Sequence, residues 1–301
     1  MKRISINLIL LCFTIFLSAK DKPNIVILLA DDLGWADLGY QGSDDIRSPH
    51  IDSLAKNGIR FTDGHVSASV CSPSRAGLMT GRYQQRFGHE ANSPPPSDGM
   101  DLEQITMADR LKKLGYRTGL IGKWHLGNED KFYPTRRGFD YFYGLRSGSR
   151  SYFYQAQKDD KSGNVRAIEE NGKPVKFDGY LTDVFGQKAI DFINAKDDKP
   201  FFLFHSFTAP HGPMHATEED KTLFASIENT KRRSYAAMIW AMDRAIGQLV
   251  DALKASGEFE NTLIWFLSDN GGATGNASIN LPLAGHKGCL LYTSPSPRDR
   301  S

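Results

Sequence analysis

Four short apolar runs divide the chain, and each of them ends at polar or ionisable residues. They cover residues 24–30, 116–121, 201–207 and 262–267. Runs of this length that are rich in β-branched and aromatic side chains are typical of buried strands. Between the last two runs, residues 235–254 carry apolar side chains at spacings of three and four residues, which predicts an amphipathic helix.

Strands that alternate with helices predict an α/β fold, and we expect a large, mostly parallel central sheet with helices on both faces. In such a sheet the carboxyl ends of the strands line the ligand crevice, so the polar residues beyond the four runs should meet at one edge. These residues are Asp31, Asp32, Lys123, His125, His211, Asp269 and Asn270. Asp and Asn are also common turn formers, but their recurrence after successive strands favours a shared site.

The overall composition does not single out a charged partner. The chain is 40% hydrophobic, which is enough to bury a substantial core, and its 37 basic residues nearly balance its 35 acidic residues. A balanced charge provides no overall field for nucleic acid, and we expect no nucleic-acid partner. Any recognition of an anion must therefore be local.

Residues 1–19 resemble a signal peptide. Lys2 and Arg3 precede an apolar run that is too short to cross a bilayer comfortably, and Ser18 and Ala19 are the small residues of a cleavage site. We expect an exported protein, periplasmic or extracellular, with no stable membrane span. An uncleaved anchor is the alternative.

Cysteine usage draws attention to a single residue. Cys12 lies in the predicted signal peptide and Cys289 near the end of the chain, so Cys71 alone lies in the predicted mature domain and has no internal disulfide partner. It opens the segment CSPSR (71–75), which lacks the apolar stripe that surrounds most buried structural cysteines.

This segment resembles the CxPxR maturation signature of type I sulfatases. Further matches follow in the order that the family has them, and they are the Asp31–Asp32 pair, GYRTGLIGKWHLG (115–127), TAPHGP (208–213) and SDNGG (268–272). The resemblance covers about residues 22–288 and implies an alkaline-phosphatase-like fold with a catalytic domain over residues 20–288. It also implies hydrolysis of a sulfate ester, on a sulfated carbohydrate or an aryl sulfate.

The polar side chains at the predicted edge of the sheet suit a hard divalent cation. Carboxylate and amide oxygens favour Ca²⁺ or Mg²⁺ over Zn²⁺, and ligand type alone does not separate the first two ions. We expect Ca²⁺, with Mg²⁺ as the alternative. By resemblance, the ligands are Asp31, Asp32, Asp269 and Asn270, joined by the modified side chain at Cys71.

The resemblance implies a mechanism as well. A formylglycine-generating maturation enzyme oxidises Cys71 to formylglycine, whose hydrate attacks sulfur, expels the alcohol and then eliminates sulfate. Arg75 would hold the modified side chain, and it lies one helical turn beyond Cys71 if this segment is helical. Lys123 and Lys287 would bind the sulfate group.

The resemblance leaves the proton transfers divided among three residues. His211 or Lys287 would protonate the leaving group, and His125 would assist the second step. Lys123 and His125 are two residues apart, so an extended segment would direct both side chains to one face and Trp124 to the core.

The sequence does not specify the substrate. Residues 144–180 are rich in Gly and Ser and predict exposed loops, which either cover a crevice for a sulfated sugar or form a solvated surface. The basic and aromatic residues that suggested a sugar site are Arg146, Arg150, Tyr152, Tyr154 and Arg166.

Residues 289–301 do not resemble the family. The peptide from Cys289 to Asp299 can be encoded by a sequence like the transposase adapter of sequencing libraries, so we expect a non-native tail after Gly288. The small C-terminal antiparallel subdomain of the family would then be missing, and function would belong to a longer parent protein. A genuine Pro- and Ser-rich tail is the alternative.

Two other classes of function remain open at this level. One is a phosphodiester or phosphonate monoester hydrolase of the same superfamily, which can share the metal and the formylglycine. The other is a non-catalytic sulfoglycan-binding protein, which is disfavoured because binding alone does not require the CxPxR cysteine.

Overall fold

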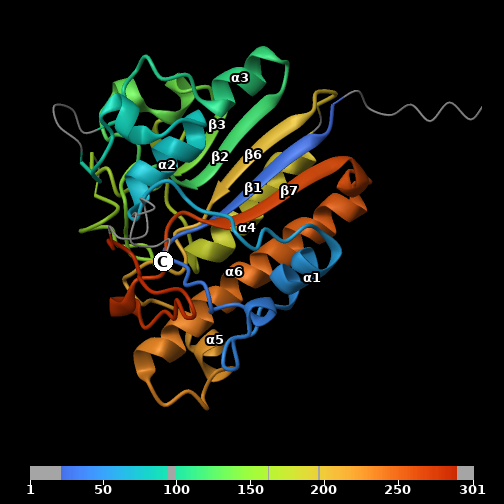
Figure 1. The fold of residues 1–301 in the computed structure, drawn as a ribbon. Coiled ribbons are helices and arrows are strands. Elements are labelled where there is room, and N and C mark those ends of the chain that lie inside the picture. Colours follow the sequence, from blue (N-terminus) through green and yellow to red (C-terminus); the bar gives the residue numbers. More distant parts are fainter. Residues whose placement is uncertain (1–21, 94–98, 162, 196, 290–301) are drawn as a thin grey trace, which may run out of the picture.

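A computed structural model describes residues 22–93, 99–161, 163–195 and 197–289, and a seven-stranded sheet crosses its centre (Figure 1). In spatial order the strands are β5 (Lys173–Pro174), β4 (Glu169–Glu170), β3 (Tyr141–Leu145), β2 (Arg117–Lys123), β6 (Phe201–Ser206), β1 (Asn24–Ala30) and β7 (Thr262–Ser268). The last five strands in this order run parallel, while β4 and β5 form an antiparallel hairpin at one edge. The predicted mostly parallel sheet is confirmed.

Helices cover both faces of the sheet. They are α1 (Pro49–Asn57), α2 (Cys71–Thr80), α3 (Met107–Lys113), α4 (Leu181–Asn194), α5 (Glu218–Thr222) and α6 (Thr230–Ala255). Short 3-10 helices are η1 (Gly39–Gln41), η2 (Gln84–Phe87), η3 (Asp130–Phe132), η4 (Pro134–Arg136), η5 (Phe259–Asn261) and η6 (Thr274–Asn276). Figure 1 shows α2 and α3 on one face and α1, α4 and α6 on the other.

The side chains of β1 divide the core into two layers. Val26, Leu28 and Ala30 pack in the cluster that contains the buried side chains of α4 and α6, whereas Ile27 and Leu29 pack with those of α2 and α3. Both faces of the strand are buried, which explains why its sequence is a continuous apolar run instead of an alternating one.

The predicted strands correspond to β1, β2, β6 and β7, with ends that differ by at most two residues. The sequence pattern does not predict β3, β4 and β5, because β4 and β5 contain two residues each and β3 is a five-residue strand interrupted by Gly144. Segments this short carry no measurable periodicity.

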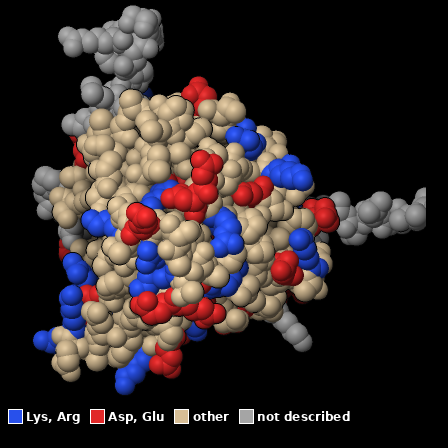
Figure 2. Space-filling view, turned by 90° about the horizontal axis from the view of Figure 1, so that it is seen from below, with Lys and Arg blue, Asp and Glu red and all other residues tan. Residues whose placement is uncertain are grey.

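The strand β7 lies at the outer edge of the sheet within the described part of the chain. Its side chains Leu263 and Trp265 are 48% and 43% exposed, and Phe61 stacks on Trp265 with 5.5 Å between the ring centroids. On one face of the molecule, Figure 2 shows Lys and Arg interspersed with Asp and Glu among uncharged residues. An edge strand with an apolar face is a place where further chain can pack.

Among the described residues, no helix is both long enough and apolar enough to cross a bilayer. The predicted signal peptide lies outside the described residues, as does the predicted tail beyond Cys289.

Candidate active site

The carboxyl ends of the parallel strands bring distant parts of the sequence together. Asp31 and Asp32 follow β1, Asp269 follows β7 closely, and Lys123 is the last residue of β2. The backbone of this edge is tied across strands, because Asp31 N donates to the carbonyl of Ala209 at 3.0 Å. Similarly, Asp269 N donates to the carbonyl of Ala30 at 3.0 Å. These links fix the positions from which the carboxylates extend.

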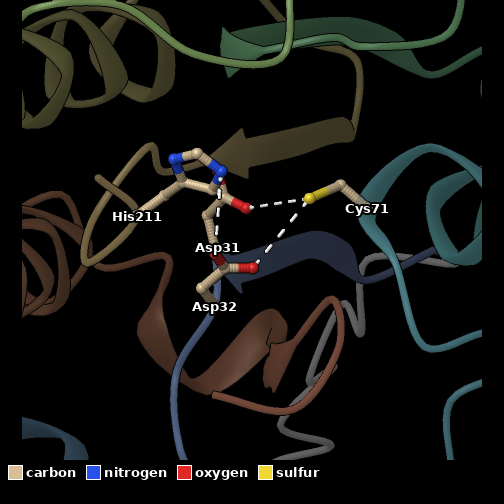
Figure 3. Close-up of side chains that lie close together, drawn as sticks. All are labelled: Asp31, Asp32, Cys71 and His211. Atoms are coloured by element: carbon tan, nitrogen blue, oxygen red, sulfur yellow. Dashed lines mark hydrogen bonds and ion pairs between the residues drawn. The ribbon is translucent and has the colours of Figure 1, made fainter. Parts of the chain in front are cut away.

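Cys71 is the first residue of α2 and is buried against the two aspartates (Figure 3). Its Sγ lies 3.6 Å from Asp31 Oδ1 and 3.9 Å from Asp32 Oδ1. The next backbone N–H, that of Ser72, donates to Asn92 Oδ1 at 3.0 Å, so a side chain from outside the helix caps its first turn. The thiol therefore lies at the positive end of a helix, where an anion is favoured.

Arg75 crosses the edge of the sheet from α2. Its Nε and Nη2 both lie 2.9 Å from Asp269 Oδ2, while Nη1 donates to Ser206 Oγ at 2.6 Å and to the carbonyl of Lys123 at 3.2 Å. Helical spacing places Arg75 one turn after Cys71, as expected, and its side chain is fully buried. It connects the helix with the ends of β2, β6 and β7.

Two lysines neutralise the pair of aspartates. Lys123 Nζ lies 2.7 Å from Asp31 Oδ2, and both side chains are completely buried. Lys287 Nζ lies 2.8 Å from Asp32 Oδ2 and 3.2 Å from Cys71 Sγ, and its side chain is 19% exposed. Lys287 is thus the cation that reaches both the thiol and solvent.

The two candidate histidines approach from different loops. His211 Nε2 lies 3.6 Å from Asp32 Oδ2, and its Nδ1 donates to the carbonyl of Gly212 at 2.6 Å, which leaves Nε2 facing the site (Figure 3). The carbonyl of His125 accepts a hydrogen bond from Ser72 Oγ at 2.6 Å, next to the start of α2. Gly148 provides the space for the His125 ring, because a Cβ there would lie 2.6 Å from Cε1 of the imidazole.

The prediction that Lys123 and His125 belong to one extended segment, with both side chains on the same face, is wrong. β2 ends at Lys123, and His125 has a φ of 57°, in the left-handed region. The neighbouring Trp124 is buried as predicted, and its indole N–H donates to the carbonyl of Phe132 at 2.9 Å.

The balance between burial and neighbouring charges lowers the pKa of Asp31 and raises that of Asp269. Burial opposes the ionisation of Asp31, but the cations around it, with Lys123 the strongest, outweigh this effect and hold its pKa below the ordinary value. For Asp269, burial and the nearby Asp31 raise the pKa, and Arg75 offsets only part of the increase. The ionised carboxylate of Asp31 is therefore the better partner for a cation.

The thiol and the partly buried imidazole of His125 are both kept neutral. Burial, reinforced by the carboxylates of Asp269, Asp31 and Asp32, raises the pKa of Cys71 to about 12 against the opposing charge of Lys123. Loss of solvation, with the positive charges of Lys123 and Arg75, holds the pKa of His125 well below its ordinary value. A neutral imidazole is able to accept a proton.

Several of these side chains fit a divalent cation. One ligand atom from each of Asp31, Asp32, Cys71 and His211 lies within 4.8 Å of the others. Asn270 Nδ2 donates to Asp32 Oδ1 at 2.7 Å, while the buried Asn270 Oδ1 has no hydrogen-bond partner, as expected of an atom that is available to a cation. The carboxylate of Asp269 is bonded to Arg75 and to Asp32 N, so its role as a ligand stays a prediction.

The loop residues that suggested a sugar site have other partners. Arg150 is buried and forms a bidentate ion pair with Asp160, with two nitrogen–oxygen distances of 2.7 Å. Tyr152 is buried as well, whereas Arg166 remains exposed and Tyr154 is half-buried. The expectation of exposed loops is wrong for Arg150 and Tyr152, because the carboxylate of Asp160 and the aromatic core compensate for their loss of water.

Sequence reasoning missed a buried network behind Asp32. Asp37 accepts from Arg232 Nη1 at 2.6 Å and from the hydroxyl of Tyr235 at 2.8 Å, and that hydroxyl accepts from Gly34 N at 3.1 Å. The backbone N–H of Ile279 also donates to Asp37, which ties α6 to both loops that enter the site. Asp37 lies in a Gly-containing loop that is typical of an ordinary turn, so only its contacts with distant residues identify its role.

The fold and this site define an α/β protein with a buried cluster of carboxylates and cations at the carboxyl edge of its sheet. The family model described as Sulfatase matches residues 23–294, and the chain belongs to this family. It is 37% identical to mouse arylsulfatase J over 279 residues and 36% identical to human arylsulfatase G over 278 residues. The alignments cover 90% and 83% of this chain, respectively.

A solved structure agrees with this assignment. The crystal structure of Ps i-CgsB in complex with k-i-k-neocarrahexaose has a TM-score of 0.85 and 41% sequence identity, and the match covers 89% of this chain and 62% of that chain. The two arylsulfatases are covered over 46% and 51% of their length, so the chain spans about half the length of these curated relatives.

Proposed function

We propose that the protein hydrolyses sulfate esters with a formylglycine side chain formed from Cys71. The observation that carries this proposal is the position of Cys71 at the start of α2, where its Sγ lies within 3.9 Å of both Asp31 and Asp32 and 3.2 Å from Lys287 Nζ. Because burial keeps the thiol protonated, an unmodified Cys71 would be a weak nucleophile. Membership of the sulfatase family supports its conversion by a separate formylglycine-generating enzyme.

The proposed reaction proceeds in two steps at the modified residue 71, a displacement at sulfur and then an elimination of sulfate. A hydroxyl of the hydrated side chain loses its proton, and its oxygen bonds to sulfur while the bond between sulfur and the ester oxygen breaks. The leaving alkoxide takes a proton from His211 or Lys287. His125, which is held neutral, then accepts a proton from the second hydroxyl as sulfate leaves and the aldehyde re-forms. Lys123 and Lys287 supply positive charge for the sulfate group.

Arg75 has a different part in the proposal. Its guanidinium is bonded to Asp269 and Ser206, and it lies one helical turn from residue 71. We assign it the role of holding the modified side chain and the carboxylate of Asp269 in place, because a rigid fork with several donors suits such a position.

We further propose that the site binds Ca²⁺, with Mg²⁺ as the alternative. The ligands would be Asp31, Asp32, Asp269 and Asn270 together with the modified residue 71, and the unpartnered Asn270 Oδ1 supports this set. A bound divalent cation would polarise the sulfate oxygens and favour an ionised nucleophile. The charges of Asp31, Asp32 and Asp269 are already balanced by those of Lys123, Lys287 and Arg75. A bound divalent cation would therefore give the site a net positive charge, which attracts an anionic ester.

A sulfated carbohydrate is the proposed substrate class. The solved structure with 41% identity contains a bound k-i-k-neocarrahexaose, which makes oligosaccharides of this type the first candidates. The signal-peptide-like residues 1–19 support an exported protein, periplasmic or extracellular.

The test is sulfate release by the full-length protein, co-produced with a formylglycine-generating enzyme. We expect release of inorganic sulfate from 4-nitrophenyl sulfate and from a neocarrahexaose-type oligosaccharide, and none from the Cys71→Ala variant. Matched phosphate and phosphonate esters serve as comparison substrates. Faster turnover of those esters than of the sulfate esters would instead place the protein among the phosphonate and phosphodiester hydrolases.

A further inference from the structure

Tyr152 is the least exposed of the five basic and aromatic residues that suggested a sugar site. Its side chain is 1% exposed, and its ring stacks on Tyr180 with 5.4 Å between centroids and 17° between planes. The backbone carbonyl of Tyr152 accepts from Leu181 N at 2.9 Å, which anchors the residue to the first turn of α4. The residue is therefore held within the packed framework of the protein.

The hydroxyl of Tyr152 reaches the loop that carries His211. It contacts the carbonyl oxygen of Thr208 and lies 2.8 Å from the carbonyl oxygen of His211. These carbonyls belong to the two ends of one turn, because His211 N donates to the carbonyl of Thr208 at 2.9 Å. Burial raises the pKa of Tyr152 well above its ordinary value, so the hydroxyl keeps its proton.

The residues beside Tyr152 are themselves fixed. Arg150 forms its bidentate pair with Asp160, and Ser151 N donates to Asp159 Oδ2 at 2.6 Å. Because its two preceding residues are held by these bonds and its own ring is stacked on Tyr180, Tyr152 has little freedom to follow a movement of the His211 loop.

The position of the His211 backbone determines where its imidazole points. Nδ1 is bonded to the carbonyl of the next residue, Gly212, and Nε2 is directed toward Asp32 at 3.6 Å. A shift of the turn would therefore move Nε2 relative to residue 71. A displacement of about 1 Å is enough to lower a rate by about two orders of magnitude.

We propose that Tyr152 is a positioning residue that holds His211 where it protonates the leaving group. The inference rests on the proposed sulfatase function, and it takes His211, and not Lys287, as the general acid. Tyr152 touches neither substrate nor the reacting atoms and acts only through the turn from Thr208 to His211.

Tyr180 offers a matched control in the same chain. Its ring stacks on Tyr152, and its hydroxyl donates to the carbonyl of His215 at 2.9 Å, farther along the same loop. Tyr152→Phe and Tyr180→Phe each remove one hydroxyl from this stacked pair. Only the first variant loses the contacts with the turn at His211.

The experiment compares both variants with the wild type on a series of sulfate esters whose leaving alcohols increase in pKa. We expect Tyr152→Phe to lower kcat about tenfold for a sugar sulfate and less than about threefold for 4-nitrophenyl sulfate, with little change in KM, because only a poor leaving group depends strongly on an acid. Tyr180→Phe should lower kcat by less than about threefold on every ester.

If the loss of kcat varies with the pKa of the leaving alcohol in the same way for Tyr152→Phe and Tyr180→Phe, the proposal is overturned. If Tyr152→Phe does not fold, Asp160→Asn loosens the support of Tyr152, and it must show the same selective loss on poor leaving groups. Asp160→Asn with a wild-type dependence would also overturn the proposal. A wild-type protein without sulfate release would instead contradict the proposed function itself.

Discussion

At the scale of single residues, each ionised group of the site is balanced by a partner. Lys123 pairs with Asp31, Lys287 with Asp32, and Arg75 with Asp269. In a buried setting the removal of one partner leaves the other charge uncompensated. Replacement of either member is therefore expected to disturb its partner as well as remove its own chemistry.

His205 is the contrasting case of a buried polar residue without a partner. It lies on β6, fully buried, with its ring 3.9 Å from that of Phe207, and neither ring nitrogen has a hydrogen-bond partner. Burial lowers the pKa of His205 to about 3, so the folded protein keeps the imidazole neutral over a range where the unfolded chain takes up a proton.

This arrangement predicts an acid sensitivity that His205→Leu should remove. Because the folded pKa is below the unfolded value of about 6.5, the stability present above pH 6.5 is lost as the pH falls toward 3, by up to about 1.4 kcal/mol per pH unit. Urea unfolding at pH 7.5 and at pH 5 checks this. The free energy of unfolding should fall less for His205→Leu than for the wild type, and an equal fall would contradict the prediction.

At the scale of elements, two helices hold the site from opposite faces of the sheet. α2 provides residue 71 and Arg75, while α6 holds the loops around Asp32 and Ile279 through the buried pair of Arg232 and Asp37. The same guanidinium also pairs with Asp45, whose side chain is 38% exposed, whereas that of Asp37 is fully buried.

The difference in burial predicts unequal costs for the two carboxylates. Asp37→Asn should lower the free energy of unfolding by about 3–5 kcal/mol, since it leaves Arg232 partly uncompensated in a buried place. Asp45→Asn removes a partly solvated partner and should cost about 1 kcal/mol or less. Urea denaturation of both variants measures the two values, and equal losses would show that Asp37 is not the centre of the network.

The sequence predicted a strand or helix well where the apolar pattern of that segment alone determined its structure. The run at 24–30 coincides with β1 because both of its faces are buried and Asp31 ends it. α6 begins at Thr230, five residues before the predicted start, because its polar first turn is capped by Asn229 and carries no apolar stripe. The hairpin of β4 and β5 depends on pairing with β3, which no local pattern encodes.

The sequence predicted which residues belong to the candidate site, but it did not predict the contacts between them. The residues beyond the strands were identifiable because chemistry and strand ends coincide in the sequence. The pairing of Arg75 with Ser206, and the contact of Tyr152 with the His211 turn, join segments 131 and 59 residues apart. Such contacts arise only from the packing of the whole chain.

At the scale of the whole molecule, the sheet brings the metal candidates from β1 and from the segment after β7 to one point. A cation at this point would link the adjacent Asp31 and Asp32 with Asn270, which is far from them in sequence. An ion that binds only the folded chain stabilises it in proportion to its affinity and concentration.

Calcium should therefore raise the resistance of the protein to urea. At a concentration of about 100 times Kd, the expected gain is about 2.7 kcal/mol, and excess EGTA should abolish it. Asp32→Asn should lose most of this response, whereas Asp45→Asn, which lies outside the proposed ligand set, should retain it. Identical unfolding curves with calcium and with EGTA would contradict a calcium site.

The central claim is that residue 71 of the mature protein is a formylglycine. Its most direct test is the mass of the peptide that contains residue 71, after production of the full-length protein with a formylglycine-generating enzyme. Conversion of the thiol to an aldehyde predicts a loss of about 18 Da, together with sulfate release that Cys71→Ala abolishes. An unmodified thiol in the presence of a competent maturation enzyme would contradict the account and favour a binding protein.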